Sequence, residues 1–101
     1  MLSELIKFET VSAIGPSNGE YTRCADYILS YVSSFLPNSF LIGDPKAPVV
    51  VAEWTGEDET LGPVLLNCHY DVVPAGDLTA WDKCEPFGGE IKEGKVRFRE
   101  E

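Results

Sequence analysis

The chain has 101 residues, of which 17 are Asp or Glu and 8 are Lys or Arg, so its formal net charge at pH 7 is −9. A chain of this length forms at most one small domain or part of a larger one. The acidic balance argues against binding to nucleic-acid backbones or anionic membranes, because both need clustered basic residues. The hydrophobic fraction of 44% and the charged fraction of 25% are ordinary for a globular protein, which argues against disorder.

The N-terminal sequence and the cysteines predict a cytoplasmic protein. The first ten residues carry Glu4 and Glu9 among apolar residues, and they lack the basic and unbroken apolar regions of a signal peptide. No apolar run approaches the ~20 residues that span a bilayer. Cys24, Cys68 and Cys84 show no C-x-x-C spacing, so neither a zinc ribbon nor a disulfide framework is indicated. We expect three reduced thiols, at least two of them buried.

Hydrophobic periodicity predicts two helices in the first third of the chain. A short helix is expected from Ser3 to Phe8, and the following Ile-Gly-Pro marks a break. Ser17 and Glu20 have the spacing of a capping box, which predicts the start of a longer helix. Apolar residues between Tyr21 and Leu36 then recur at helical spacing until a proline ends the pattern. This apolar stripe indicates core packing.

Strands are predicted after the second helix. Ser39–Ile42 and the valine-rich Pro48–Trp54 are two candidates. Pro63–Cys68 is apolar at nearly every residue, which is typical of a strand covered on both faces. Glu90–Lys92 and Lys95–Arg99 are expected to pair as a closing hairpin. The order of helices and strands predicts an α/β fold in which helices pack on a mixed sheet.

The single histidine, His69, follows the most apolar predicted strand, and Asp71 comes two residues later. In an extended backbone these two side chains project to the same side. The carboxylate can then accept the imidazole N–H, which orients the ring and makes its other nitrogen a better metal ligand. The same spacing also fits a strand end whose histidine is simply hydrogen-bonded, and the spacing alone leaves both interpretations open.

The run LLNCHYDVVP, residues 65–74, resembles the first metal-ligand signature of the dinuclear zinc metallopeptidase and amidohydrolase family. That family includes aminoacylase, carboxypeptidases and succinyl-diaminopimelate desuccinylase, and its pattern is a hydrophobic strand followed by H-x-D-V-V-P. Trp81 and the Pro86-Phe87 pair also fit the family, as a loop beside the active site for which packing is the alternative role. The resemblance extends from about residue 5 to residue 96, and Trp54-Thr55-Gly56 is most like the aminoacylase branch.

The resemblance implies a function and a site. His69 would be a ligand of one of two zinc ions, and Asp71 would act in catalysis by orienting His69 without binding the metal. The complete family enzyme would be a homodimer that hydrolyses the amide bond of a small N-acyl amino acid or peptide with a metal-activated water. Residues 1–101 would be the N-terminal part of its catalytic domain, without the lid or dimerisation domain.

The sequence departs from the family after Val96. The family continues into a G-R-G-x-x-D-x-K-like segment whose aspartate bridges the two metals, whereas this chain reads RFREE to its last residue. A catalytic zinc needs about three protein ligands, and this chain offers one. We therefore expect a fragment that is inactive by itself. Two alternatives stay open: a small, non-enzymatic, acidic interaction domain, and a mononuclear metal or acid–base enzyme that uses His69 and Asp71 alone.

Overall fold

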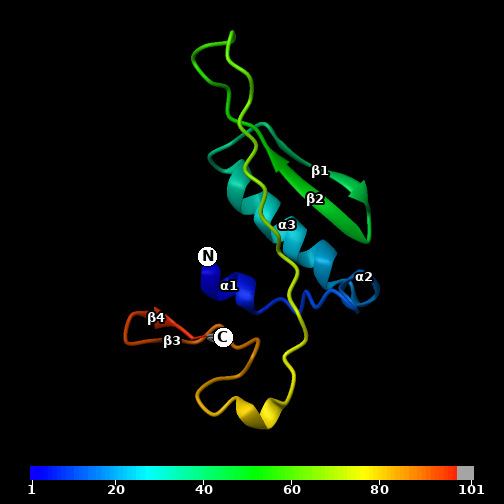
Figure 1. The fold of residues 1–101 in the computed structure, drawn as a ribbon, viewed down its shortest axis with the longest axis vertical. Helices are drawn as coiled ribbons and strands as arrows, with labels where there is room; N and C mark the ends of the chain where they lie inside the picture. Colours follow the sequence, from blue (N-terminus) through cyan, green and yellow to red (C-terminus); the bar gives the residue numbers. More distant parts are fainter. Residues whose placement is uncertain (98–101) are drawn as a thin grey trace.

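The computed structural model describes residues 1–97 and shows an elongated mixture of helices and small antiparallel sheets (Figure 1). Its extents are 54 × 34 × 23 Å, and its radius of gyration of 16.2 Å exceeds the ~13 Å of a compact domain of 100 residues. The mixed α and β fold class predicted from the sequence is confirmed. The elements are α1 (Leu2–Ile6), α2 (Gly15–Asn18), α3 (Glu20–Ser33), β1 (Ser39–Asp44), β2 (Ala47–Ala52), a 3₁₀ turn η1 (Leu78–Ala80), β3 (Ile91–Lys92) and β4 (Lys95–Val96).

Helix α3 supplies most of the buried core. Its apolar stripe faces the β1–β2 hairpin, and Tyr21, Cys24 and Ala25 are its buried residues. The helix starts close to Gly15, where a side chain in place of the glycine hydrogen would collide with the ring of Tyr21. Thr22 also ties α3 to the hairpin, because its hydroxyl donates to the carbonyl of Pro45 at 3.0 Å. The first part of the predicted helical stripe is therefore confirmed as core packing, whereas Phe35 near its end is exposed.

The predicted capping box at the start of α3 is wrong. Ser17 lies inside the separate one-turn helix α2, where its hydroxyl donates to the carbonyl of Ile14 at 2.9 Å. The physical reason is that Pro16 favours the first turn of a helix, so α2 begins early, and Gly19 then ends it with a φ of 80°. Gly19 is also the N-cap of α3.

The two hairpins agree with four of the five predicted strands. Strands β1 and β2 pair antiparallel in a register that runs from Ser39 opposite Ala52 to Asp44 opposite Ala47. Strands β3 and β4 pair across Glu93-Gly94, whose positive φ angles of 54° and 74° suit a tight two-residue turn. The predicted closing hairpin is thus present, although residues 98 and 99 of the prediction lie outside the described residues.

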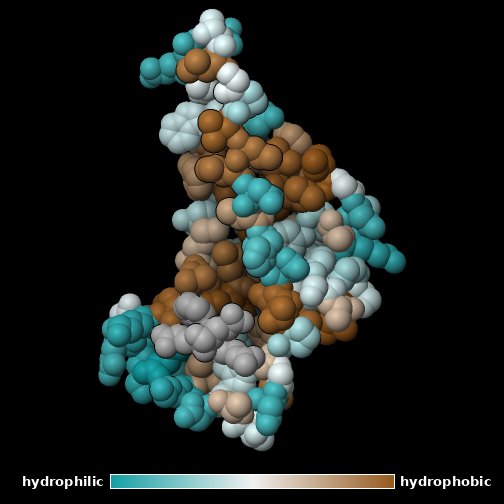
Figure 2. Space-filling view, in the orientation of Figure 1, coloured by the Kyte–Doolittle hydropathy of each residue, from teal (hydrophilic) through white to brown (hydrophobic). Residues whose placement is uncertain are grey.

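The predicted buried strand at residues 63–68 is wrong. This segment is extended, but no strand pairs with it in the described part of the chain. Val64, Leu65 and Leu66 are 87%, 88% and 86% exposed. A strand forms only where a second strand offers hydrogen bonds, and residues 1–97 place none alongside. Figure 2 shows hydrophobic side chains gathered over the upper part of this face, where the exposed segment and the β1–β2 hairpin lie.

The exposed segment makes the surface unusually large. The accessible area is 7935 Å², whereas a compact protein of the same mass exposes about 5,700 Å². It also explains why the prediction of at least two buried thiols is wrong. Cys24 is buried in α3, but Cys68 is exposed beside the apolar run and Cys84 is half-buried; all three are free. Within residues 1–97, no helix combines the length and the apolar character needed to cross a membrane.

Candidate functional site

The segment that carries His69 and Asp71 is held by the N-terminal part of the chain. Val11 and Val72 form a parallel bridge between the two segments. On either side of it, the Val72 N–H donates to the Thr10 carbonyl at 2.9 Å, and the Ser12 N–H donates to the Val72 carbonyl at 3.0 Å. These bonds join residues that are 62 and 60 positions apart in the sequence. They fix the backbone directly after His69.

Tyr70 anchors the same segment to the core from its other side. Its hydroxyl donates to the carbonyl of Pro48 in β2 at 2.5 Å, and its ring meets that of Tyr21 edge-on, with centroids 5.5 Å apart. Burial raises the pKa of the Tyr70 hydroxyl, and the nearby Cys24, Tyr21 and Asp71 raise it further. Tyr70 is therefore a structural residue, as the alternation of side chains along an extended backbone predicts.

His69 and Asp71 are brought together on the opposite side. The Nδ1 atom of His69 lies 3.0 Å from the backbone carbonyl oxygen of Asp71 and 3.2 Å from its carboxylate Oδ1. Both neighbours are acceptors, so this geometry favours the neutral form of the ring with the proton on Nδ1 and the lone pair on Nε2. The His69 side chain is 86% exposed and that of Asp71 is 47% exposed. The ring is therefore oriented at one nitrogen and accessible at the other.

This arrangement suits one metal ligand but not a complete metal centre. An imidazole whose Nδ1 is tied to a carbonyl and a carboxylate is the usual form of a zinc-binding histidine. In the part of the chain that the structure describes, however, no group of three or more His, Cys, Asp or Glu side chains could hold an ion together. Cys68 is exposed next to His69, yet it belongs to no such group. A catalytic zinc needs about three protein ligands, so the described residues supply a partial donor set.

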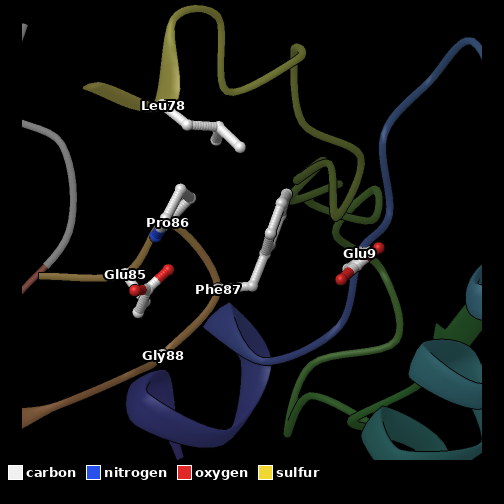
Figure 3. A pocket seen from close by; sticks show the side chains of 6 residues that line it. All are labelled: Glu9, Leu78, Glu85, Pro86, Phe87 and Gly88. Atoms are coloured by element: carbon white, nitrogen blue, oxygen red, sulfur yellow. The ribbon is translucent and has the colours of Figure 1, made fainter. Parts of the chain in front are cut away.

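The resemblance placed Trp81, Pro86 and Phe87 beside an active site. In the structure these residues line two hollows, and His69 lines neither of them. Pro86 and Phe87 face Leu78 across a hollow of about 400 Å³ (Figure 3). Trp81 lines the second hollow, of about 580 Å³, and its ring N–H donates to the carbonyl of Ala75 at 3.0 Å. This hydrogen bond ties the Trp81 ring to the loop that carries it. The predicted role of the three residues beside a catalytic centre remains a prediction.

Thr10 is the site residue that sequence reasoning did not identify. It is 2% exposed, and its hydroxyl donates to the carbonyl of Tyr70 at 2.6 Å. In the sequence it stands at the end of the predicted short helix, in a run, Phe8–Ser12, that also resembles the family, but no role at the site was predicted for it. Its contact with Tyr70 depends on a long-range pairing that periodicity does not reveal.

Comparisons with known proteins support the family resemblance. A probable carboxypeptidase S-like protein from Dictyostelium discoideum is 42% identical over 104 aligned residues, which cover 95% of this chain and 20% of that protein. Succinyl-diaminopimelate desuccinylase from Methylobacterium nodulans is 56% identical over 41 residues, or 40% of this chain and 10% of the relative. The desuccinylase from Rhodospirillum centenum is 58% identical over 31 residues, which cover 31% of this chain and 8% of that enzyme. No family model matches the chain, and no solved structure is significantly similar to it.

These matches relate the chain to the peptidase and desuccinylase hydrolases and confirm the resemblance predicted from its motif. The chain spans between about a tenth and a fifth of the length of the relatives described above. None of the three carries the name aminoacylase, so the assignment to that branch stays a prediction.

Proposed function

We propose that this chain is part of a zinc-dependent amidohydrolase of the N-acyl-amino-acid deacylase or peptidase type. The observation that carries the proposal is the orientation of the single histidine. Nδ1 of His69 is held by the carbonyl and the carboxylate of Asp71, while the ring projects into solvent with Nε2 accessible. The similarity to a carboxypeptidase S-like protein and to desuccinylases supports the same class of reaction.

In this proposal His69 binds one of two zinc ions through Nε2, and Asp71 holds the ring in the orientation that binding requires. Zinc, when bound, supplies polarisation of the amide carbonyl and a water of lowered pKa. The substrate is a small N-acyl amino acid or a peptide. The chain covers a small share of its relatives' length and supplies one ligand, so the general base, the other ligands and the lid or dimerisation domain come from further polypeptide. The homodimer and the cytoplasmic location remain predictions.

Zinc titration of the 101-residue chain tests the role of His69. The imidazole signals in an NMR spectrum belong to one residue, because the sequence contains one histidine. We expect Zn²⁺ to shift the Nε2 resonance of His69 while Nδ1 keeps its proton. The variant His69→Ala should lose the zinc response, and Asn67→Ala, an exposed neighbour on the same segment, should keep it. Zinc binding at Nδ1, or a response unchanged in His69→Ala, would contradict the proposal.

A second assay tests whether the chain, with its partial set of zinc ligands, is inactive by itself. The 101-residue chain, incubated with zinc and a panel of N-acyl amino acids and dipeptides, should hydrolyse none of them faster than zinc alone. Turnover that disappears in His69→Ala would show that the chain is a complete enzyme. That result would favour the mononuclear alternative over a partial dinuclear site.

The exposed apolar segment favours one alternative function, a non-enzymatic interaction domain. Val64, Leu65 and Leu66 expose nearly their whole side chains, and contiguous apolar surface of this kind marks association sites. A thermal unfolding scan with light scattering separates the two functions. A self-contained interaction domain should melt sharply as a monomer or a defined dimer, whereas part of an enzyme domain should melt broadly and scatter light.

A further inference from the structure

Both peptide groups that flank Asp71 are held by one buried residue, Thr10. The hydroxyl of Thr10 donates to the carbonyl of Tyr70, which belongs to the peptide group before Asp71. The carbonyl of Thr10 accepts the N–H of Val72, which belongs to the peptide group after Asp71. The distances are 2.6 and 2.9 Å, and Thr10 is 2% exposed, so water has little access to the hydroxyl and the carbonyl of Thr10.

These two bonds determine where the groups of Asp71 point. In a trans peptide group the C=O and the N–H point in opposite directions. Because the Val72 N–H points at Thr10, the carbonyl of Asp71 in the same group points away from Thr10, and there it lies 3.0 Å from Nδ1 of His69. With both peptide planes held, φ and ψ of Asp71 are set. These angles set the direction of its Cα–Cβ bond, and in the rotamer that the side chain adopts, Oδ1 lies 3.2 Å from the same Nδ1.

We infer that Thr10 is a positioning residue that sets which nitrogen of His69 carries the proton. Its hydroxyl and its carbonyl aim two acceptors of Asp71 at Nδ1, so the proton stays on Nδ1 and Nε2 is left as the free donor atom for an electrophile. The hydrogen bonds of Thr10 go to the backbone on either side of Asp71, and it acts through that backbone. The value of this orientation for zinc rests on the proposed function, whereas the position of the proton does not.

Nitrogen-15 NMR of the single imidazole tests this inference directly. At about pH 9, where imidazoles are neutral, the ring-nitrogen shifts report the ratio of the two protonated forms. We expect the folded chain to favour the Nδ1–H form about fivefold more than a short peptide of residues 67–73, since a net hydrogen bond contributes about that factor. Thr10→Val has nearly the same shape but lacks the hydroxyl, and it should move the ratio several-fold towards that of the peptide. Thr10→Ser keeps the hydroxyl and should restore the ratio of the native chain.

Ser12→Ala is the matched control. Ser12 lies on the same segment, and its hydroxyl approaches the Val72 carbonyl at 3.4 Å, but it touches neither peptide group of Asp71. A native ratio in Ser12→Ala and a changed ratio in Thr10→Val would support the inference. An unchanged ratio in a folded Thr10→Val would overturn it.

Two further results decide the remaining cases. If Thr10→Val does not fold, two measurements on the native chain test the inference. The proton must lie on Nδ1, and a scalar coupling across the hydrogen bond must join the Val72 nitrogen to the Thr10 carbonyl carbon. A proton on Nε2 would overturn the inference. If the ratios behave as expected but zinc leaves Nε2 unaffected, the proposed function fails and the role of Thr10 stands.

Discussion

Replacing Tyr70 with Phe tests the anchor that fixes the candidate site to the core. The substitution removes the hydroxyl that donates to Pro48 at 2.5 Å and keeps the ring that packs edge-on against Tyr21. A net intramolecular hydrogen bond contributes about 1 kcal/mol to stability. Because this bond joins the site segment to β2, we expect Tyr70→Phe to lower the free energy of unfolding by about that amount.

Urea unfolding followed by circular dichroism measures this loss. For a chain of this size, a loss of about 1 kcal/mol lowers the urea midpoint by about 0.5–1 M and the melting temperature by about 4–8 °C. Tyr31→Phe is the control, because Tyr31 is an exposed residue of α3 whose ring packs on Phe35 in a similar edge-on contact. If the two variants differ by less than about 0.3 kcal/mol, the bond from Tyr70 to β2 does not stabilise the fold, and the reasoning is refuted.

Three further predictions concern the thiols and the exposed segment. Burial, with a smaller contribution from a nearby glutamate, raises the pKa of the Cys24 thiol from 9.0 to about 11. The protonated Cys24 thiol therefore contributes its full stabilisation below pH 9, and this stabilisation is lost as the pH rises towards 11. Between about pH 8 and about pH 10, the unfolding free energy measured in urea should fall more for the native chain than for Cys24→Ala. A thiol reagent added to the folded protein should label Cys68 first, Cys84 more slowly and Cys24 only on unfolding, and early labelling of Cys24 would show that α3 is not packed on the hairpin. Leu65→Glu should change the unfolding free energy by less than about 0.5 kcal/mol and reduce light scattering on heating, whereas a large loss of stability would show that residue 65 is covered.

Local patterns predicted the elements whose stabilising contacts are also local. The stripe of α3 depends on helical periodicity, and its residues Tyr21, Cys24 and Ala25 became the buried core. The tight turn at Glu93-Gly94 was predictable from Gly94, because glycine adopts positive φ readily, whereas nothing in the sequence marked the positive φ of Glu93. The pair His69 and Asp71 also followed from a local rule, since side chains two positions apart along an extended backbone share one side.

The features that sequence reasoning missed depend on distant parts of the chain. The apolar run at residues 63–68 has the composition of a covered strand, but composition does not say where its neighbours are, and the described residues provide none. Thr10 acquires its importance from Tyr70 and Val72, which are about 60 residues away. The start of α3 was misplaced because Gly19 in a left-handed conformation competes with the capping pattern of Ser17.

The long exposed connection between β2 and Tyr70 has a consequence for handling the protein. Proteases bind their substrates as extended, accessible backbone, so the first cut in limited digestion should fall within residues 53–68. The two pieces would not separate at once, because the hydrogen bonds of Thr10 and Ser12 with residues 70–72 and the contact of Tyr70 with β2 span the break. The same connection is thus a suitable place to open the chain for a circular permutant or for the insertion of a reporter domain.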